Sequence, residues 1–167
     1  MIRALQPSDL PAVAEMFHRL SALSRIRRFF SPTESGPAWE LNYLANADGC
    51  DRLVLVAQIA ESCDSEIVGV ARYHRIGPAS PIEEHCHADV AVVVEDGWQR
   101  HGLGHRLMAH LAVAARHEGI GVFDVSILGD NDAALGLLRQ MTDRATGQRL
   151  ALSLRAGVYE GSVPLVA

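Results

Sequence analysis

The sequence predicts a single-domain α/β fold, built on a mixed, mostly antiparallel sheet of six or seven strands with helices on both faces. Two observations support this prediction. Apolar, β-branched segments alternate along the chain with segments of helical periodicity. In addition, a strand-like run at 90–94, a helical pattern at 103–118 and a second strand at 122–128 form a βαβ unit, whose strands must be parallel.

Length and composition indicate one globular domain over residues 1–167. Of the 167 residues, 49% are hydrophobic and 21% are charged, which is enough to bury a core without disulfides or a structural metal. The net charge of −5 argues against general nucleic-acid binding. No apolar run approaches the ~18 residues of a membrane span, and the first residues do not resemble a signal peptide. Cys50, Cys63 and Cys86 are interpreted as reduced thiols of a cytoplasmic protein.

The amino-terminal half is expected to contain a strand, three helices and a hairpin. Residues 2–5 are a short strand, and Ser8 is expected to cap a helix that runs to about Leu20. A second helix begins at Ser21 or Ser24 and is broken by the proline- and glycine-containing residues 31–37. The remaining predictions for this half are a helix at 38–45 and strands at 52–60 and 66–76, joined by a turn at 61–65.

The carboxyl-terminal half is expected to alternate strands and helices. The central strand covers about residues 86–95, and the long helix after it ends near Gly119, a typical C′ glycine. The other predicted elements are the strand at 122–128, a helix at 133–141 capped by residues 129–132, and strands at 148–154 and 158–166 on either side of Gly157.

A glycine loop between the central strand and the long helix is the most informative segment. Residues 103, 107, 111 and 115 share one apolar face, so the helix begins directly after the loop. Unpaired N–H groups and a partial positive charge at such a helix start favour a phosphate or a pyrophosphate. Gly102 and Gly104 let the backbone turn sharply and approach a ligand closely.

Only one of three familiar phosphate-binding patterns fits this loop. A P-loop requires Lys-Ser or Lys-Thr where His105 begins, and the dinucleotide fingerprint requires a small residue where Leu107 stands. The segment Gln99-x-x-Gly102-x-Gly104 instead resembles the acetyl-coenzyme A loop of the GCN5-related N-acetyltransferases (the GNAT family), whose pattern is Gln/Arg-x-x-Gly-x-Gly/Ala. The alternative is an ordinary glycine-rich turn between a strand and a helix.

A second motif extends the resemblance. Asn131-x-x-Ala134-x-x-Leu137-Leu138 matches the family's Asn-x-x-Ala-x-x-Leu-Tyr at three of four positions. The resemblance implies that Asn131 lies beside the pantetheine arm and the thiol of acetyl-CoA, although a helix cap is an equally ordinary role for an asparagine. Many relatives carry a tyrosine where Leu138 stands, and that tyrosine protonates the departing thiolate. A leucine has no proton to give, so this general acid is missing or supplied elsewhere.

The order of the predicted elements matches the GNAT family over nearly the whole chain. Residues 20–30 and 88–99 look like the acetyltransferase domain of bacterial protein-lysine acetyltransferases of the Pat type. In several of these relatives the domain is joined to a cyclic-nucleotide-binding or acyl-CoA-synthetase-like region, and neither region is expected within these 167 residues. The resemblance implies acetyl-CoA as the cosubstrate, a protein lysine as the acceptor and no metal.

The implied chemistry requires a base beside the acceptor amine. An ammonium ion has no lone pair, and a lysine with a pKa of ~10.4 is almost wholly protonated near neutral pH. In Pat-type relatives a glutamate of the central strand acts as the base, and Asp89 stands at the matching position. Because its side chain is one methylene shorter, a bridging water is favoured. The other interpretation of Asp89 is a solvent-facing carboxylate at the end of a strand.

The remaining site residues are assigned by the same resemblance. Backbone N–H groups of residues 92–94 are expected to polarise the thioester carbonyl, where the central strand bulges and splays from the next strand. The residues expected to bind acetyl-CoA are Val92, Val93, Val94, Gln99, Arg100, His101, Gly102, Leu103, Gly104, His105 and Asn131.

Other polar residues carry weaker hypotheses. Alternative bases are Glu83, Glu84, Glu95 and Asp96. His85, His87 and Asp89 alternate along a strand and share a face, but no second cluster at ligand spacing supports a metal site. Cys86 is interpreted as a buried, inert thiol.

The acceptor is the least determined feature. Arg25, Arg27 and Arg28 form a basic helix face, which is either a solvated surface or the border of a cleft for an acidic acceptor. The leading hypothesis is an acetyl-CoA-dependent N-acetyltransferase that transfers the acetyl group directly to a protein lysine. The alternatives are a small amine as the acceptor and a non-catalytic acyl-CoA-binding regulatory module. The oligomeric state is not predicted.

Overall fold

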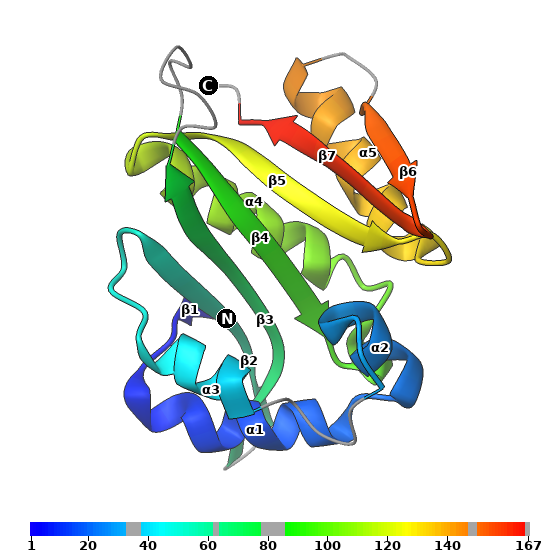
Figure 1. The fold of residues 1–167 in the computed structure, drawn as a ribbon. Helices are drawn as coiled ribbons and strands as arrows, with labels where there is room; N and C mark the ends of the chain where they lie inside the picture. Colours follow the sequence, from blue (N-terminus) through cyan, green and yellow to red (C-terminus); the bar gives the residue numbers. More distant parts are fainter. Residues whose placement is uncertain (33–37, 62–63, 78–85, 147–149, 166–167) are drawn as a thin grey trace.

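The computed structural model describes residues 1–32, 38–61, 64–77, 86–146 and 150–165 (Figure 1). The strands are β1 (Ile2–Ala4), β2 (Arg52–Glu61), β3 (Asp64–Gly77), β4 (Cys86–Val94), β5 (Ile120–Leu128), β6 (Leu152–Arg155) and β7 (Val158–Pro164). The helices are α1 (Leu10–Arg19), α2 (Ala22–Phe29), α3 (Ala38–Ala45), α4 (Leu103–His117) and α5 (Asp132–Thr146), with short 3-10 turns η1 (Pro7–Asp9) and η2 (Asp96–Trp98).

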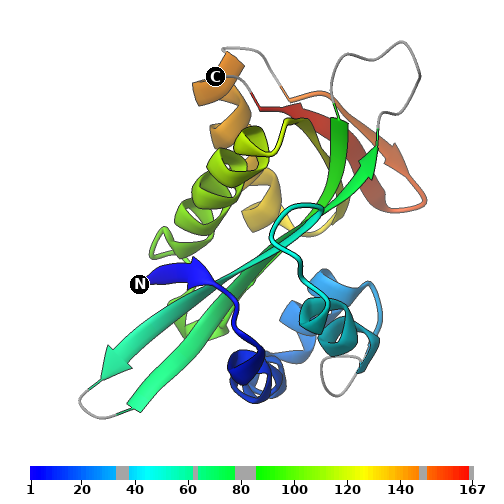
Figure 2. The ribbon, with the colours of Figure 1, turned by 90° about the vertical axis from the view of Figure 1, so that its left-hand side faces the viewer.

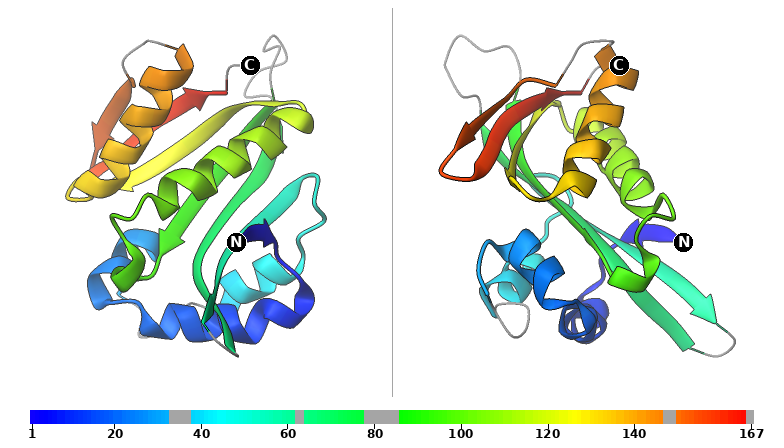
Figure 3. Two further views of the ribbon diagram at one scale, coloured as in Figure 1. Left: turned by 180° about the vertical axis from the view of Figure 1, so that it is seen from behind. Right: turned by 90° about the vertical axis from the view of Figure 1, so that its right-hand side faces the viewer.

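The seven strands form one mixed sheet in the order β1-β2-β3-β4-β5-β7-β6. Strands β4 and β5, which are joined through α4, pair in parallel, and the other neighbouring strands pair antiparallel. The views in Figures 2 and 3 show α4 and α5 on one face of the sheet and α1, α2 and α3 on the other. The predicted α/β fold, with its mostly antiparallel sheet and helices on both faces, is confirmed.

Each face of the sheet has its own apolar core. The core under α4 and α5 includes the fully buried side chains of Leu107, Leu111 and Phe123. The core under α1, α2 and α3 includes Phe17 and Phe29, whose rings meet edge to face with centroids 5.3 Å apart. At the end of β4, Val93 belongs to one core and Val94 to the other, so both faces of the strand are apolar there.

Strands β4 and β5 diverge toward their carboxyl ends (Figure 1). Their pairing runs from Cys86 opposite Ile120 to Asp89 opposite Asp124, and the described parts of both strands continue beyond it unpaired with each other. The predicted splay is thus confirmed. The predicted bulge at residues 92–94 is wrong, because the β3–β4 register is unbroken there and the shift in the β4–β5 register falls at Cys86/His87.

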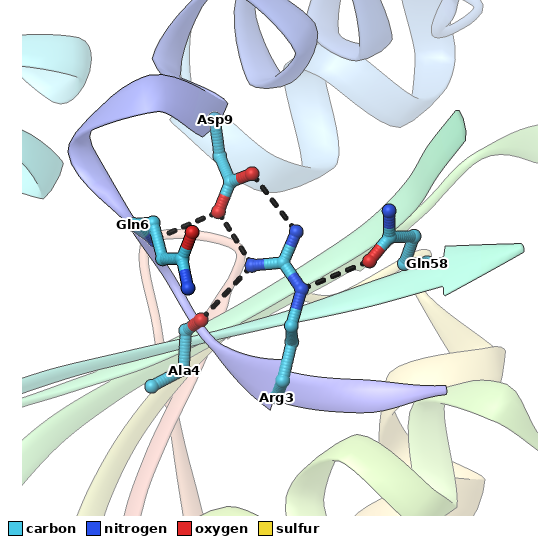
Figure 4. Close-up of polar contacts among 5 residues, drawn as sticks. All are labelled: Arg3, Ala4, Gln6, Asp9 and Gln58. Atoms are coloured by element: carbon cyan, nitrogen blue, oxygen red, sulfur yellow. Dashed lines mark hydrogen bonds and ion pairs between the residues drawn. The ribbon is translucent and has the colours of Figure 1, made fainter. Parts of the chain in front are cut away.

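The first turn of the chain is organised differently from the prediction. Ser8 lies inside η1 and does not cap α1; the backbone N–H of Gln6 instead donates to the Asp9 carboxylate at 2.7 Å. Arg3 of β1 makes two further hydrogen bonds to Asp9, at 2.6 and 2.9 Å, and its Nε donates to Gln58 of β2 (Figure 4). The carboxylate therefore joins the first strand to the start of α1, a long-range role that local sequence does not reveal.

Several element boundaries also differ from the predictions. Helix α5 continues to Thr146 rather than about 141, and β6 begins at Leu152 rather than 148. The predicted glycine stop after α4 is confirmed, because Gly119 has a left-handed φ of 77°. No helix within the described ranges is long and apolar enough to span a membrane.

Candidate active site

The glycine loop leads directly into α4. Gly102 adopts a left-handed φ of 77° at the N-cap position, and the non-glycine residue Arg100 also has a positive φ of 62°. The first helical hydrogen bond is donated by the N–H of Arg106 to the carbonyl of Gly102 at 3.0 Å. The amides of Leu103 and Gly104 come before that bond and have no carbonyl of the helix to bind. Their N–H groups therefore point out of the amino end of α4, where they favour an anion.

Gly104 is not required by the packing of the protein itself. A Cβ built at this position would lie 3.8 Å from Leu137 and 3.9 Å from Val94, which are ordinary van der Waals distances. The glycine nevertheless lines a large cavity beside the loop, and any side chain there would project toward that space. The lack of a side chain at position 104 is therefore explained by a molecule that binds in the cavity, and not by a requirement of the fold.

The cavity beside the glycine loop has a volume of about 570 Å³. It lies between the amino ends of α4 and α5 and the carboxyl end of β4. The predicted cosubstrate residues that line it are Val92, Val93, Val94, Gln99, Arg100, Gly102, Gly104, His105 and Asn131. His101 is exposed and Leu103 packs against the core, and neither is among the lining residues.

Two of these residues also hold the local backbone. The Gln99 side chain donates to the Val94 carbonyl at 3.0 Å and to Ser24 Oγ at 3.2 Å, which ties the loop to α2. The Asn131 side-chain oxygen accepts from the N–H of Ala134 at 3.2 Å, so it caps α5. The capping interpretation of Asn131 is confirmed, and the same side chain lies at the cavity wall.

A second cavity of about 210 Å³ lies next to the first, on the α2 side of the diverging strands. Asp89 lines it, with a side chain that is 49% exposed. Leu138 lines it as well, but the leucine is 95% buried and offers no polar atom. Six residues line both cavities, so the two spaces adjoin each other: Arg27, Arg28, Val92, Asn131, Ala134 and Leu137.

Asp89 belongs to a cluster of charges that sequence reasoning did not find. Arg72 of β3 donates to Asp89 at 3.1 Å and to Glu40 of α3 at 3.2 Å. Glu40 is fully buried and also pairs with Arg28 of α2. Burial lowers the pKa of Arg28. Burial also opposes the charge of Arg72, but the attraction of Glu40 and Asp89 is stronger in sum and raises the pKa of Arg72. The sequence feature that could have indicated this cluster is Arg72, an arginine inside an otherwise apolar strand.

The three arginines of α2 do not form the predicted basic face. Arg25 donates to the carbonyls of His18 and Leu20, and Arg28 is buried against Glu40. Arg27 donates to the Asp130 carbonyl at 2.6 Å, across the space between α2 and the β5–α5 turn. Arg27 and Arg28 line both cavities, so this part of α2 borders the cleft, as the second interpretation expected, and an acidic acceptor stays a prediction.

The weaker candidates have structural partners. Glu95 forms an ion pair with Arg19. Asp96 accepts hydrogen bonds from Ser21 and Ser24 at the start of α2; burial opposes the charge on Asp96, but these hydrogen bonds lower its pKa overall. Glu83 and Glu84 lie outside the described residues.

In the described part of the chain, the histidine and the cysteine of β4 contact other side chains. His87 Nδ1 lies 3.0 Å from Asp124 Oδ2, and His85 lies outside the described ranges. Within those ranges no group of three or more potential ligands is close enough to bind a metal. Cys86 is half-buried, and its thiol contacts the guanidinium of Arg75, a cationic neighbour that the sequence did not reveal.

An anion-binding helix start, a splayed pair of parallel strands and a carboxylate in the adjoining cleft are the features of a GNAT-type acyltransferase. The family model for the acetyltransferase (GNAT) family matches residues 20–142, so the chain belongs to this family. The acetyltransferase Pat of Mycolicibacterium smegmatis is 29% identical over 165 residues, which are 99% of this chain and 46% of that protein. The N-alpha-acetyltransferase RimI of Mycobacterium tuberculosis is 35% identical over 83 residues, 50% of this chain and 49% of the relative.

Solved structures agree with this assignment. The GNAT domain of S. lividans PAT superposes with a TM-score of 0.80 at 26% identity, covering 98% of this chain and 89% of that domain. A cAMP-binding acyltransferase from Mycobacterium smegmatis superposes with a TM-score of 0.61 at 26% identity, and this chain covers 43% of it. The chain thus spans less than half of the length of the two Mycolicibacterium and Mycobacterium smegmatis relatives.

Proposed function

We propose that this protein is an acetyl-CoA-dependent N-acetyltransferase that moves an acetyl group directly from the thioester to a lysine amine of another protein. The observation that carries the proposal is that two adjoining cavities, which share six lining residues, lie where the pairing of β4 with β5 has ended. One cavity ends at an anion-binding helix start and the other at a half-exposed carboxylate. The proposal treats residues 1–167 as one domain that acts in the cytoplasm.

The residues around the larger cavity fit the cosubstrate. The amides at the start of α4, with Gly102 and Gly104, would hold the diphosphate, and Arg100 and His105 lie at the same wall. Val92 and Asn131 border both cavities, so the β4 backbone near Val92 would polarise the thioester carbonyl beside the cap of α5. The bound molecule supplies an acetyl group activated as a thioester.

Asp89 is the proposed general base. Its carboxylate is half-exposed and is held by Arg72, so it can accept a proton from an entering amine either directly or through a water. The short aspartate side chain favours the water-mediated route. Transfer is direct in this scheme, because the cavity with Asp89 adjoins the cavity proposed for the cosubstrate and no enzyme nucleophile is needed. Cys86 is not required in this scheme.

The acceptor assignment rests on relatives. The acetyltransferase Pat match covers nearly the whole chain, and lysine acetylation is the activity that its family resemblance implies. The mouth of the smaller cavity carries the exposed aromatic side chains of Phe30 and Trp39, which are 46% and 56% exposed. Apolar rings at a cleft entrance favour a large acceptor surface over a small polar amine.

The test combines binding with an acceptor screen. Calorimetry with CoA should show binding, and mass spectrometry should find acetyl-lysine on proteins of a cell extract incubated with the enzyme and acetyl-CoA. Asp89→Asn should bind CoA like the wild type and acetylate far more slowly. Acetylation of polyamines or free amino acids without protein acetylation would assign a small acceptor. CoA binding without any acetyl transfer would indicate the regulatory module.

A further inference from the structure

Leu138 stands where the family resemblance implies a tyrosine that protonates the leaving group, and the inference drawn from this difference rests on the proposed function. When the acceptor amine displaces the thioester sulfur, the sulfur takes the electron pair of the broken C–S bond. Leu138 cannot protonate it, since its side chain is aliphatic and buried. A neighbouring positive charge can stabilise the thiolate without transferring a proton.

Arg27 lies where such a charge would act. It lines both cavities, as do Val92 and Asn131, at the position where the proposed function places the thioester. Its Nη2 donates to the Asp130 carbonyl at 2.6 Å, which holds the guanidinium beside the turn that precedes Asn131. Its Nε is buried and has no hydrogen-bond partner among the described atoms. The side chain is thus held in place, with its positive charge beside both cavities.

The charge of Arg27 is less neutralised than that of Arg28 and Arg72, the other arginines that line the smaller cavity. Arg28 also has a buried Nε without a described partner, but its guanidinium pairs with the fully buried Glu40. Arg72 is paired with both Glu40 and Asp89. The only carboxylate paired with Arg27 among the described residues is Asp130, which lies 3.4 Å away and is 64% exposed to solvent. An exposed partner screens a neighbouring charge weakly.

We propose that Arg27 stabilises the CoA thiolate as it departs, in place of the tyrosine that Leu138 replaces. The amine nitrogen bonds to the carbonyl carbon, the C–S bond breaks, and its electron pair remains on sulfur beside the guanidinium. The proton from the amine goes to Asp89 or to water. Arg27 keeps its own protons, because a guanidinium does not deprotonate in proteins. The thiolate leaves as such or is protonated by solvent.

Other charged and titratable side chains face the same junction, and a test must leave them unchanged. From α2, α3 and the sheet they are Arg28, Glu40, Arg72 and Asp89; from the α4 and α5 starts they are Arg100, His105, Asp130 and Asp132. The informative change therefore removes the charge of Arg27 alone. Arg27→Gln does this and retains an amide donor for the Asp130 carbonyl. Arg27→Lys retains the charge with a different donor geometry.

The experiment measures the ionisation of bound CoA and needs no acceptor. The thiolate absorbs in the ultraviolet, so titration of the complex gives the pKa of the bound thiol, and desulfo-CoA provides both the optical blank and a measure of binding without sulfur. In Arg27→Gln the pKa of the bound thiol should rise by about one pH unit, equivalent to about tenfold weaker binding of the thiolate. Arg27→Lys should stay near the wild type. The matched control is Arg139→Gln, which removes an exposed arginine of α5 that lines neither cavity.

The possible results are distinct. Equal desulfo-CoA affinity with a higher thiol pKa in Arg27→Gln supports the proposal. The same thiol pKa in the wild type and Arg27→Gln overturns it, as does an equal rise in Arg139→Gln. Loss of desulfo-CoA binding in both Arg27 variants assigns the residue to structure only, which also overturns it. If the wild type binds neither CoA nor desulfo-CoA, the proposed function itself fails.

Discussion

Substitution of the two glycines of the loop by alanine should have opposite effects on the protein without ligand. Gly104 lies in the first turn of α4, where an added Cβ meets its neighbours at 3.8 and 3.9 Å. Alanine there removes backbone entropy from the unfolded chain and should stabilise the fold by about 0.5 kcal/mol. Gly102 has a left-handed φ of 77°, so alanine at that position should destabilise by about 1–2 kcal/mol.

Thermal unfolding followed by circular dichroism measures both effects. For a domain of this size, 1 kcal/mol corresponds to about 2–4 °C in Tm. Gly104→Ala should therefore melt about 1–2 °C higher than the wild type, and Gly102→Ala about 2–8 °C lower. CoA at a hundred times its Kd stabilises a protein that binds it by about 2.7 kcal/mol. Gly104→Ala should lose part of that gain, and Gly104→Val should lose most of it.

The combination of results is what tests the reasoning. A variant that is more stable alone and less stabilised by CoA shows that the glycine is needed by the ligand rather than by the fold. If Gly104→Val keeps the full CoA-dependent rise in Tm, the diphosphate does not lie over the start of α4. If Gly104→Ala melts below the wild type without ligand, the packing argument for this position is wrong.

Three further predictions concern carboxylates. Asp89→Asn should lower kcat by about 10²–10⁴-fold and make the remaining rate increase more steeply with pH, as measured in a pH–rate profile. Glu40→Gln should lower the free energy of unfolding by about 3–5 kcal/mol in urea denaturation, because Arg28 and Arg72 lose a buried counter-charge. Hydrogen bonds from Arg3 lower the pKa of Asp9, so Asp9→Asn should remove about 1–2 kcal/mol above pH 4 and reduce the loss of stability below it.

Each of these has a result that would contradict it. An unchanged pH–rate profile in Asp89→Asn removes that residue from the role of base. Equal urea midpoints for Glu40→Gln and the wild type would mean that the buried pairs contribute no net stability. For Asp9 the direction of the pH dependence follows from linkage. Because its pKa is lower in the folded protein, the ionised carboxylate stabilises the fold above the unfolded pKa of ~3.9. This stability is lost as the pH falls through the pKa of the folded state. An unchanged acid limb in Asp9→Asn would contradict that assignment.

The features that local sequence predicted are those formed by residues close together in the chain. The left-handed glycine at 102, the α4 start after it and the glycine stop at 119 all follow from neighbouring residues. The βαβ unit follows from the alternation of periods, and its crossover requires the parallel pairing of β4 with β5. The alternative role of Asn131 as a helix cap could be read from the sequence for the same reason, since a cap and its helix are contiguous.

The features that were missed depend on partners distant in sequence. Asp9 joins β1 to α1 through Arg3, a contact that replaced the expected Ser8 cap. The bulge at residues 92–94 was expected by analogy, but β4 leaves β5 after Asp89 and Asp124 while its register with β3 stays unbroken there. The basic face of α2 was read from composition, which gives the sign of a charge and not the direction of its side chain.

The cluster around Glu40 connects the stability of the fold to the chemistry of the site. Arg72 contacts the buried Glu40 and the half-exposed Asp89 at nearly the same distance, 3.2 and 3.1 Å. The position of the proposed base therefore depends on how α3 packs against β3. Since Arg28 shares the same glutamate, α2 is held by the same group of charges, and Arg27 is presented from that helix. A substitution in α3 can consequently alter both the base and the proposed stabiliser of the thiolate without contacting either one.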